Sequence, residues 1–369
     1  MNLSYWEIKT SFSNVDFTII GSGIVGISTA LRLRELHPKS KIIIIDKGIF
    51  PNGASTKNAG FACFGSLTEL IDDLKTHSEQ EVINLVNKRW QGLLLLRNNL
   101  GDRAINFKQF GGFELFNSKE DLALAKQHYQ KINTLIHPIF KQDIFSFHNN
   151  GFGFQLKQNL LGFNRFEGQI DTGKMMLGLI KKGIKNNIQI INNVEVTAIN
   201  DHSKVSIELN NSFTFNTKKV FLATNGFAKQ FLDVDVQPAR AQVIITNKIK
   251  NLPIKGTFHV HKGYYYFRNI NNRILLGGGR NLDFKAEKTT EFGLTDIVQN
   301  KLEYLLKKII LPNTNFTIAH RWSGIMGIGS KKKAIVQQIS SNVFCGVRLG
   351  GMGVAIGSLI GKELAEKLN

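Results

Sequence analysis

Four residues near the amino terminus have the types and spacing that bind a dinucleotide. Gly21, Gly23 and Gly26 form a GxGxxG pattern after the apolar run VDFTII. Asp46 lies twenty residues after Gly26, directly after the run IIII. The first two glycines permit a tight turn and close approach of the backbone to a pyrophosphate, whereas the third lets a helix pack closely on the strand. A carboxylate at Asp46 can accept hydrogen bonds from ribose hydroxyls. This order of features predicts a dinucleotide-binding βαβ unit over residues 15–46.

The composition is that of a folded protein. The chain has 369 residues, of which 42% are hydrophobic and 10% aromatic, so we expect two domains. No apolar run reaches the roughly 18 residues of a membrane span. The apolar stretch after Phe17 lacks the basic segment of a signal peptide, which predicts a cytoplasmic protein. Two cysteines, Cys63 and Cys345, support neither a disulfide framework nor a thiolate metal cluster, and we expect no metal site.

The charge balance is strongly basic. The chain carries 47 basic and 28 acidic residues, a formal net charge of +19. Such an excess is compatible with a polyanionic partner. The alternative source of the excess is a genome rich in Lys, Asn, Ile and Phe codons. We favour the second interpretation because the lysines are spread along the chain and basic runs such as Lys331–Lys333 are short.

The periodicity of apolar residues predicts how the remaining elements are organised. Helical periodicity covers 67–100, a strand begins near Gly111, and helices are expected over 121–136 and 172–185. Strands follow at 188–191 and 194–199, and then a β-meander turns at Asn210–Asn211. Residues 237–325 are β-rich, and the chain closes with the strand NVFCGVRL, a glycine turn and a helix. We therefore predict an α/β protein with interleaved domains, a cofactor domain of 1–75, 166–236 and 326–369, and a substrate domain of 76–165 and 237–325.

Three later features favour FAD over NAD as the dinucleotide. The loop GASTKNAG follows the second strand directly, where an extended cofactor continues past its ribose, and Ser55, Asn58 and Gly60 suit contact with a flat ring. The strand ending FLATNG runs into small residues, as expected beneath a pyrophosphate. The glycines of GGMG precede the final helix, whose amino terminus can face a flavin carbonyl and stabilise charge in the reduced ring.

With these motifs in order, the chain resembles the D-amino-acid oxidase-like family of FAD-dependent oxidoreductases, which includes glycine oxidase, sarcosine oxidase and gamma-glutamylputrescine oxidoreductase. The resemblance covers nearly the whole chain. Besides the glycine pattern it rests on SYWE, GASTKNAG, FEGQIDTGKM, FLATNG, QPARAQ, RWSGIMGIG and GVRLGGMGVAIG. It implies a glutathione-reductase-type Rossmann domain that binds FAD, interleaved with an α+β substrate domain that contains an antiparallel sheet.

The resemblance also implies which residues contact FAD. Val196 would meet the adenine, the residues of 223–226 would flank the phosphates, and those of 351–354 would reach the flavin ring. The full set of expected FAD-binding residues is Gly21, Gly23, Gly26, Asp46, Lys47, Ser55, Asn58, Ala59, Gly60, Val196, Ala223, Thr224, Asn225, Gly226, Gly351, Met352, Gly353 and Val354.

The reaction implied is oxidation of a C–N bond in an amine or amino acid, by hydride transfer to flavin N5 and hydrolysis of the imine. No strong protein base is required, because positioning supplies much of the barrier reduction. We assign no catalytic residue and expect a surface or structural role for His259 and His261. Relatives that oxidise small amino acids often carry an arginine in the segment RWSGIMGIG, but Met326 stands near that place. The expected substrate-binding residues are Tyr264, Tyr266, Trp322, Met326 and Arg348.

Several alternatives stay open. The family includes a tRNA wobble-uridine modification domain, so an RNA-modifying flavoenzyme is the second hypothesis, and a flavin-binding protein without turnover is the third. Neither cysteine matches a covalent attachment site, and we predict noncovalent FAD. The sequence leaves undetermined the amine, the electron acceptor (oxygen or a carrier) and the oligomeric state.

Overall fold

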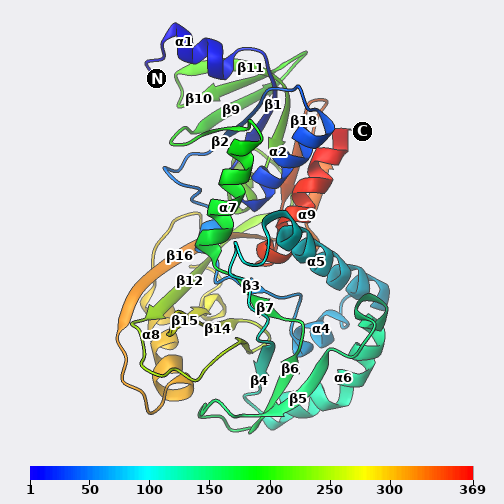
Figure 1. The fold of residues 1–369 in the computed structure, drawn as a ribbon, viewed down its shortest axis with the longest axis vertical. Helices are drawn as coiled ribbons and strands as arrows, with labels where there is room; N and C mark the ends of the chain where they lie inside the picture. The colour runs from blue at the N-terminus through cyan, green and yellow to red at the C-terminus, as the bar shows by residue number, and fades with distance from the viewer. Residues whose placement is uncertain (369) are drawn as a thin grey trace.

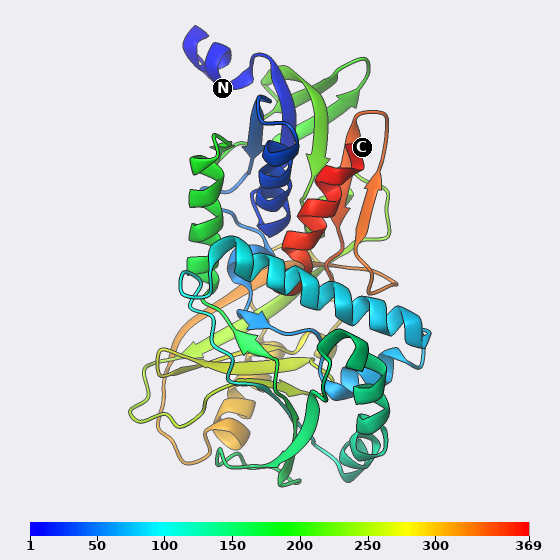
Figure 2. The same ribbon diagram turned by 45° about the vertical axis from the view of Figure 1, so that its right-hand side comes forward.

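Two large sheets lie one above the other and are joined by long helices (Figure 1). The structure is a computed structural model, and it describes residues 1–368. Both termini lie beside the upper sheet, while the chain crosses to the lower sheet and back more than once (Figures 1 and 2). The observed architecture confirms the predicted α/β fold with an antiparallel sheet.

The upper sheet is mostly parallel and contains the predicted nucleotide-binding unit. Its strands are, in spatial order, β17 (Ile335–Gln338), β18 (Val343–Val347), β11 (Phe213–Leu222), β1 (Val15–Ile20), β2 (Ile42–Ile45) and β8 (Gln189–Ile191), with β10 (Val205–Leu209) and β9 (Val196–Asp201) branching from β11. All four isoleucines of β2 are buried, as expected for a parallel strand covered on both faces.

Helices cover the upper sheet and bridge it to the lower one. The sheet is flanked by α2 (Ile24–Leu36), α7 (Thr172–Lys185) and α9 (Gly353–Ala365). Helix α5 (Glu79–Leu100) packs across α9, where Gly92 allows the two backbones to approach. Figure 2 shows α5 running between the two layers. This crossing fixes the amino terminus of α9 against the junction of the sheets.

The lower sheet is mixed, with one parallel pair between β13 and β4. Its strands are, in order, β16 (Ile318–Ile328), β12 (Gln237–Thr246), β15 (Arg273–Gly278), β14 (Tyr265–Ile270), β13 (Thr257–Val260), β4 (Gly112–Leu115), β6 (Leu160–Asn164) and β5 (Phe145–Asn149). Around it pack α4 (Leu67–Asp73), α6 (Lys119–Phe140) and α8 (Asp296–Leu305). A two-stranded ribbon of β3 (Phe61–Ala62) and β7 (Gly168–Gln169) lies between the layers.

The local predictions agree with the structure in most places. The helix expected over 172–185 is α7, and the β9–β10–β11 meander turns at Asn210 and Asn211, both with φ near +50°. The helical stretch 67–100 is divided into α4 and α5, because Ser78 and Glu81 form a capping box that starts a new helix. Strand β16 continues through the expected domain boundary at 325–326, and the division into domains stays a prediction. Within residues 1–368, no helix is both long and apolar enough to span a bilayer.

Candidate functional site

A cavity of about 500 Å³ lies between the two sheets. The amino termini of two long helices open onto it, α2 through Gly23 and α9 through Gly353. The wall continues past Asp46 and Val196 in one direction and past Tyr264 in the other. Unpaired backbone N–H groups at helix amino termini attract anions. The amino termini of α2 and α9 are therefore two candidate anion-binding sites on the cavity wall.

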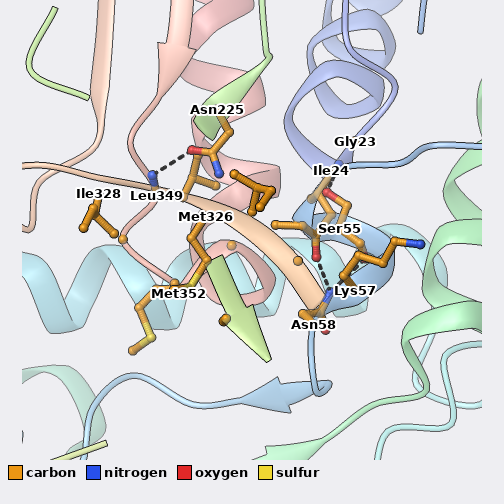
Figure 3. Close-up of a pocket in the computed structure, with 18 of the residues that line it drawn as sticks. Gly23, Ile24, Ser55, Lys57, Asn58, Asn225, Met326, Ile328, Leu349 and Met352 are labelled. Carbon is orange, nitrogen blue, oxygen red and sulfur yellow. Dashed lines mark hydrogen bonds between the residues drawn. The ribbon is translucent and has the colours of Figure 1, made fainter. Parts of the chain in front are cut away.

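The glycine turn after β1 forms the first of these sites. Gly21 has φ +102°, which only glycine adopts readily. Gly23 is the N-cap of α2, and a Cβ there would lie 2.7 Å from Ser55 Oγ. The Ser55 hydroxyl accepts a hydrogen bond from Ile24 N–H at 3.0 Å (Figure 3). The side chain of Ser55 therefore caps α2 from the loop that was predicted to follow the ribose.

Gly26 does not line the cavity, and its role is packing. A Cβ on Gly26 would lie 1.9 Å from the carbonyl oxygen of Gly21 and 3.2 Å from Ile19 Cγ2. Helix α2 thus packs closely against the backbone of the glycine turn and against Ile19 of β1, as the third glycine of the pattern predicts.

Asp46 is held at the carboxyl end of β2 and lines the cavity. One oxygen accepts hydrogen bonds from Ser22 N–H (2.8 Å) and Ser22 Oγ–H (2.6 Å), and the other accepts from Gly48 N–H (2.9 Å). Lys47 and Val196 line the same end, and the Lys47 ammonium lies 4.7 Å from the ring of Phe227. These bonds orient the carboxylate toward the space beside the glycine turn.

The loop GASTKNAG is ordered by Asn58. Its amide oxygen accepts hydrogen bonds from Gly60 N–H and Thr172 Oγ1–H, both at 2.9 Å. Its Nδ2 donates to the carbonyl oxygens of Ala54 and Ser55 at 3.2 and 2.8 Å. Gly60 has φ +72° and, like Asn58, lines the cavity. The loop therefore presents a fixed, flat stretch of backbone to the cavity.

The second anion site is at the GGMG turn before α9. Gly351 has φ +81°, and Met352 is the N-cap of the helix. The amide oxygen of Asn225 accepts a hydrogen bond from Leu349 N–H at 3.2 Å, which joins the turn to the end of β11 (Figure 3). The hydroxyl of Thr224, which also lines the cavity, is enclosed and has no hydrogen-bond partner within residues 1–368.

Most of the predicted site residues line this one cavity. Those on its wall are Gly21, Gly23, Asp46, Lys47, Ser55, Asn58, Ala59, Gly60, Val196, Ala223, Thr224, Asn225, Gly351, Met352, Gly353, Val354, Tyr264, Tyr266 and Met326.

Four predicted residues lie off the wall. One of them is Gly26, described above. Another is Gly226, which packs against the backbone of Met326, so that a Cβ on Gly226 would lie 2.6 Å from the carbonyl oxygen of Met326. Trp322 donates its indole N–H to the carbonyl oxygen of Lys57 at 2.9 Å and packs beneath the loop. Arg348 is buried and forms an ion pair with Asp235 at 2.6 Å, so its guanidinium is already satisfied. Neither Trp322 nor Arg348 lines the cavity.

Sequence reasoning missed a buried polar cluster at the cavity wall. His259 is 6% exposed, so of the surface or structural role expected for it only the surface position is excluded. Its Nε2 lies 2.5 Å from Glu167 Oε1. His261 is not on the same strand, because β13 ends at Val260 and His261 has φ +52° in the following turn. The Cys63 thiol lies within 4.8 Å of both groups. Because Glu167 Oε1 is occupied by His259 and by the Thr257 hydroxyl, we interpret the cluster as a hydrogen-bonded group.

A second missed residue is Arg268, a buried cation beneath the loop GASTKNAG. Its guanidinium donates to the carbonyl oxygens of Ala59 and, at 2.9 Å, Ile170. Burial lowers the pKa of Arg268 to about 10, and the side chain remains charged at neutral pH. Arg268 therefore joins the lower sheet to the loop that lines the cavity. The motif FRN around it carries no signal that distinguishes it from a solvated arginine.

The basic run Lys331–Lys333 is partly turned inward. The ammonium of Lys332 lies 2.5 Å from Asp73 and 3.3 Å from Glu69, and Glu69 also lies 3.5 Å from the buried Arg89. Burial acts to lower the pKa of Lys332, but these carboxylates outweigh it and the net shift is upward. The central lysine of the run is thus committed to an internal charge network.

Comparison with known proteins identifies the family. The family model described as FAD dependent oxidoreductase matches residues 16–367. The chain belongs to this FAD-dependent oxidoreductase family. Among curated proteins it is similar to the probable oxidoreductase OrdL of Haemophilus influenzae, with 21% identity over 97% of this chain and 84% of that protein.

Solved structures share the fold. The L-proline dehydrogenase of P. horikoshii has a TM-score of 0.77 at 17% identity, covering 96% of this chain and 93% of its own. The glycine oxidase of Geobacillus kaustophilus has a TM-score of 0.76 at 18% identity, covering 95% and 94%. These structural matches confirm the predicted architecture, and the family model confirms the predicted family.

The cavity of this chain fits the cofactor of its family. A dinucleotide needs an anion site for its pyrophosphate and a carboxylate for its ribose, and Gly23 and Asp46 line one continuous wall. A Cβ at Gly23 would collide with Ser55 Oγ, so the turn is kept free of side chains. The enclosed hydroxyl of Thr224 offers a further hydrogen bond beside these groups.

Proposed function

We propose that this oxidoreductase oxidises the C–N bond of a small amine or amino acid with noncovalently bound FAD. The observation that carries the proposal is the single cavity onto which α2, α9 and the loop around Asn58 open, and which continues to Tyr264 and Tyr266. When bound, FAD supplies the acceptor for a hydride from the substrate carbon, and the imine so formed is hydrolysed in water.

We assign the cofactor contacts to the residues on the wall. Gly21, Gly23 and the amino terminus of α2 hold the pyrophosphate, Asp46 binds the ribose, and Val196 lies beside the adenine. The flavin end is assigned to Asn58–Gly60 and to Gly351–Val354, where the amino terminus of α9 stabilises negative charge. The wall residues Lys47, Ser55, Ala223, Thr224 and Asn225 complete the assignment.

The substrate end of the cavity is assigned to Tyr264, Tyr266 and Met326. Burial raises the pKa of Tyr266 to about 12, so its hydroxyl stays protonated and can donate a hydrogen bond. Orienting the reacting C–H bond is the main task of these side chains, because proximity and orientation lower the barrier without a strong base.

We also propose that the enzyme is located in the cytoplasm. Its two cysteines are free and buried, as is usual in a reducing compartment.

Anaerobic mixing with candidate donors tests the proposed function directly. We expect the visible absorbance of the purified yellow protein to bleach with one class among D- and L-amino acids, N-methyl amino acids and polyamines. The class that bleaches it identifies the substrate type. A yellow protein that none of these compounds bleaches would contradict the proposal and favour RNA modification or a role without turnover.

Replacing Asp46 is expected to weaken FAD binding. Asp46→Asn keeps the shape of the side chain but removes the charge, and a hydrogen bond to a charged group contributes about 1.5–3 kcal/mol, which corresponds to a roughly 10- to 100-fold rise in Kd for FAD. Fluorescence titration of the apoprotein with FAD measures this change. Asp16→Asn is the matched control, because Asp16 accepts from Lys41 N–H and pairs with Lys218 away from the cavity wall. Equal affinities for both variants would exclude Asp46 as a ribose ligand.

Acid precipitation is expected to release the flavin into the supernatant. Cys63 lies on the cavity wall, but burial, with Glu167 and Glu69 nearby, raises its pKa well above the usual range. The thiol therefore stays protonated and is a poor nucleophile. Cys345 is buried in β18 away from the cavity, and burial raises its pKa to about 11. A yellow precipitate with a colourless supernatant would show covalent attachment.

A further inference from the structure

One row of residues crosses the lower sheet from β4 to β15. In register, Glu114 lies opposite His259, His259 opposite Tyr266, and Tyr266 opposite Gly277. Residues directly opposite one another on neighbouring strands point to the same face of a sheet. His259 and Tyr266 are therefore side by side on the face that lines the cavity, and Phe61 touches both rings edge-on, with centroids 5.3 and 5.6 Å away.

Two glycines make room for this arrangement. A Cβ on Gly277 would lie 2.7 Å from the ring of Tyr266, so the tyrosine lies flat over that glycine. A Cβ on Gly112 would lie 2.2 Å from Glu167 Oε2, so Glu167 can reach under the sheet only because Gly112 has no side chain. The positions of Tyr266 and Glu167 are thus fixed by the backbone itself.

The hydrogen bonds of His259 leave one ring nitrogen for the cavity. Nε2 lies 2.5 Å from Glu167 Oε1, and because an ionised carboxylate only accepts, we assign the hydrogen of this bond to Nε2. The same oxygen accepts from Thr257 Oγ1–H at 2.8 Å. Nδ1 has no hydrogen-bond partner within residues 1–368 and is not among the enclosed polar atoms. Because Nε2 already carries a hydrogen, any further proton on the ring must reside on Nδ1.

The surroundings favour the charged form of His259. Burial lowers its pKa, but Glu167, with smaller contributions from Glu114 and Glu69, outweighs burial and raises the pKa from 6.5 to about 8. The titratable and charged groups around the ring are Glu167, Glu114 on β4, Glu69 on α4 with its partners Arg89 and Lys332, Cys63 after β3, and Tyr266 on β14. At neutral pH the cavity wall therefore carries an Nδ1–H⁺ donor on β13, the strand next to the one that carries Tyr266.

Two of the other cations on the cavity wall are engaged in ion pairs. Lys332 pairs with Asp73 and Glu69, and Lys262 lies 3.1 Å from Asp72. Arg280 has no ion pair within the described residues, but its guanidinium stacks on Phe284 at 5.0 Å and on Tyr264 at 6.0 Å. Tyr264 is 38% exposed, which places Arg280 at the outer part of the wall.

We propose that His259 and Tyr266 together bind the carboxylate of the substrate, with Glu167 as the positioning residue that keeps His259 protonated. The inference rests on the proposed function and deepens it: the substrate is an amino acid, not a simple amine. A protonated imidazole and a phenol hydroxyl then bind the substrate carboxylate in place of the arginine that some relatives carry near the position of Met326. Charge-assisted hydrogen bonds of this kind are the strong ones.

Calorimetric titration of the FAD-loaded protein with benzoate, across pH 6–10, tests the proposal without turnover. We expect the Kd to be constant up to about pH 8 and then to rise about tenfold per pH unit as His259 loses its proton. His259→Gln should bind benzoate roughly 10- to 100-fold more weakly at pH 7 and without a bend near pH 8. Glu167→Gln should move the bend to lower pH, and Tyr266→Phe should weaken binding but leave the bend in place.

Matched controls separate this site from other cations. Benzamide, which has the same ring without the charge, should bind without a bend near pH 8. Arg280→Gln should change the Kd for benzoate by less than about threefold, as expected for an exposed cation. A wild-type benzoate Kd that is flat from pH 7 to pH 9, or binding lost in Arg280→Gln and kept in His259→Gln, would overturn the proposal. Because benzoate is not oxidised, failure of any amine to bleach the flavin would count against the proposed function and not against this site.

Discussion

Gly26→Ala is expected to destabilise the protein by about 3 kcal/mol, near the upper end of the usual cost of overpacking. The added Cβ would lie 1.9 Å from the carbonyl oxygen of Gly21, and a backbone atom cannot rotate away as a side chain can. Helix α2 must therefore move off β1, which separates its amino terminus from the glycine turn. We expect a lower urea midpoint and at least a tenfold loss of FAD affinity, measured by equilibrium unfolding and by titration of the apoprotein.

Gly151→Ala is the control for this substitution. A Cβ at Gly151 meets no atom within 4 Å, and its φ is outside the left-handed region. Its unfolding free energy should stay within about 0.5 kcal/mol of the wild type. If Gly26→Ala unfolds at the wild-type urea concentration and binds FAD normally, the close contact of α2 with β1 is not present in solution.

The features that could be predicted from the sequence are those in which neighbouring residues determine the structure. The turn at Gly21 and Gly23, the helix that begins at Thr172 and the turn at 210–211 depend on residues within a few positions. Their backbone preferences act locally, whatever the rest of the chain does. For the same reason most of the residues expected to contact FAD line one cavity, because their motifs are short and contiguous.

The buried polar cluster at the cavity wall could not be predicted in this way. Glu167 and His259 are 92 positions apart, and Cys63 reaches them from a third segment. An isolated histidine on an alternating strand has the same pattern whether its face is solvated or buried. One signal was available: the turn around Lys262–Gly263 pairs position 259 with position 266, so the predicted cavity position of Tyr266 implied one for His259.

Arg348 lies off the cavity wall, away from the place suggested by its neighbouring motif. Its place beside the GGMG turn suggested a substrate contact, but the residue adopts φ +62° and directs its guanidinium to Asp235. Asp235 lies more than a hundred positions earlier, in a segment whose sequence gives no indication of this pairing. An arginine next to a motif is therefore weaker evidence for a substrate contact than an arginine whose charge has no partner elsewhere in the fold.

Glu287→Ala is expected to destabilise the protein by about 3–5 kcal/mol, the usual cost of removing one partner from a buried ion pair. Glu287 is 2% exposed and binds the guanidinium of Arg240 through both oxygens, at 2.8 and 3.2 Å. Gln242 Nε2–H and Thr295 Oγ1–H also donate to it, each at 2.8 Å. The substitution would leave Arg240 buried without a counter-ion. It would also release the segment that carries Phe292 on the cavity wall, so we expect both the urea midpoint and the FAD affinity to fall.

The pH dependence of unfolding and a double variant test the same network. Burial raises the pKa of Glu287, but Arg240, Thr295 and Gln242 outweigh burial and the net shift is downward. A carboxyl whose pKa is lower when folded stabilises the protein above its unfolded pKa, about 4.3, and that contribution is lost as the pH falls through the folded value. Glu287→Gln should therefore lose less stability than the wild type between pH 5 and pH 3.

Arg240→Met with Glu287→Leu removes both charges and should be more stable than Glu287→Ala alone, because the cost lies in the unpaired cation. If the double variant is the less stable of the two, the ion pair itself stabilises the fold, and the desolvation argument is wrong for this site.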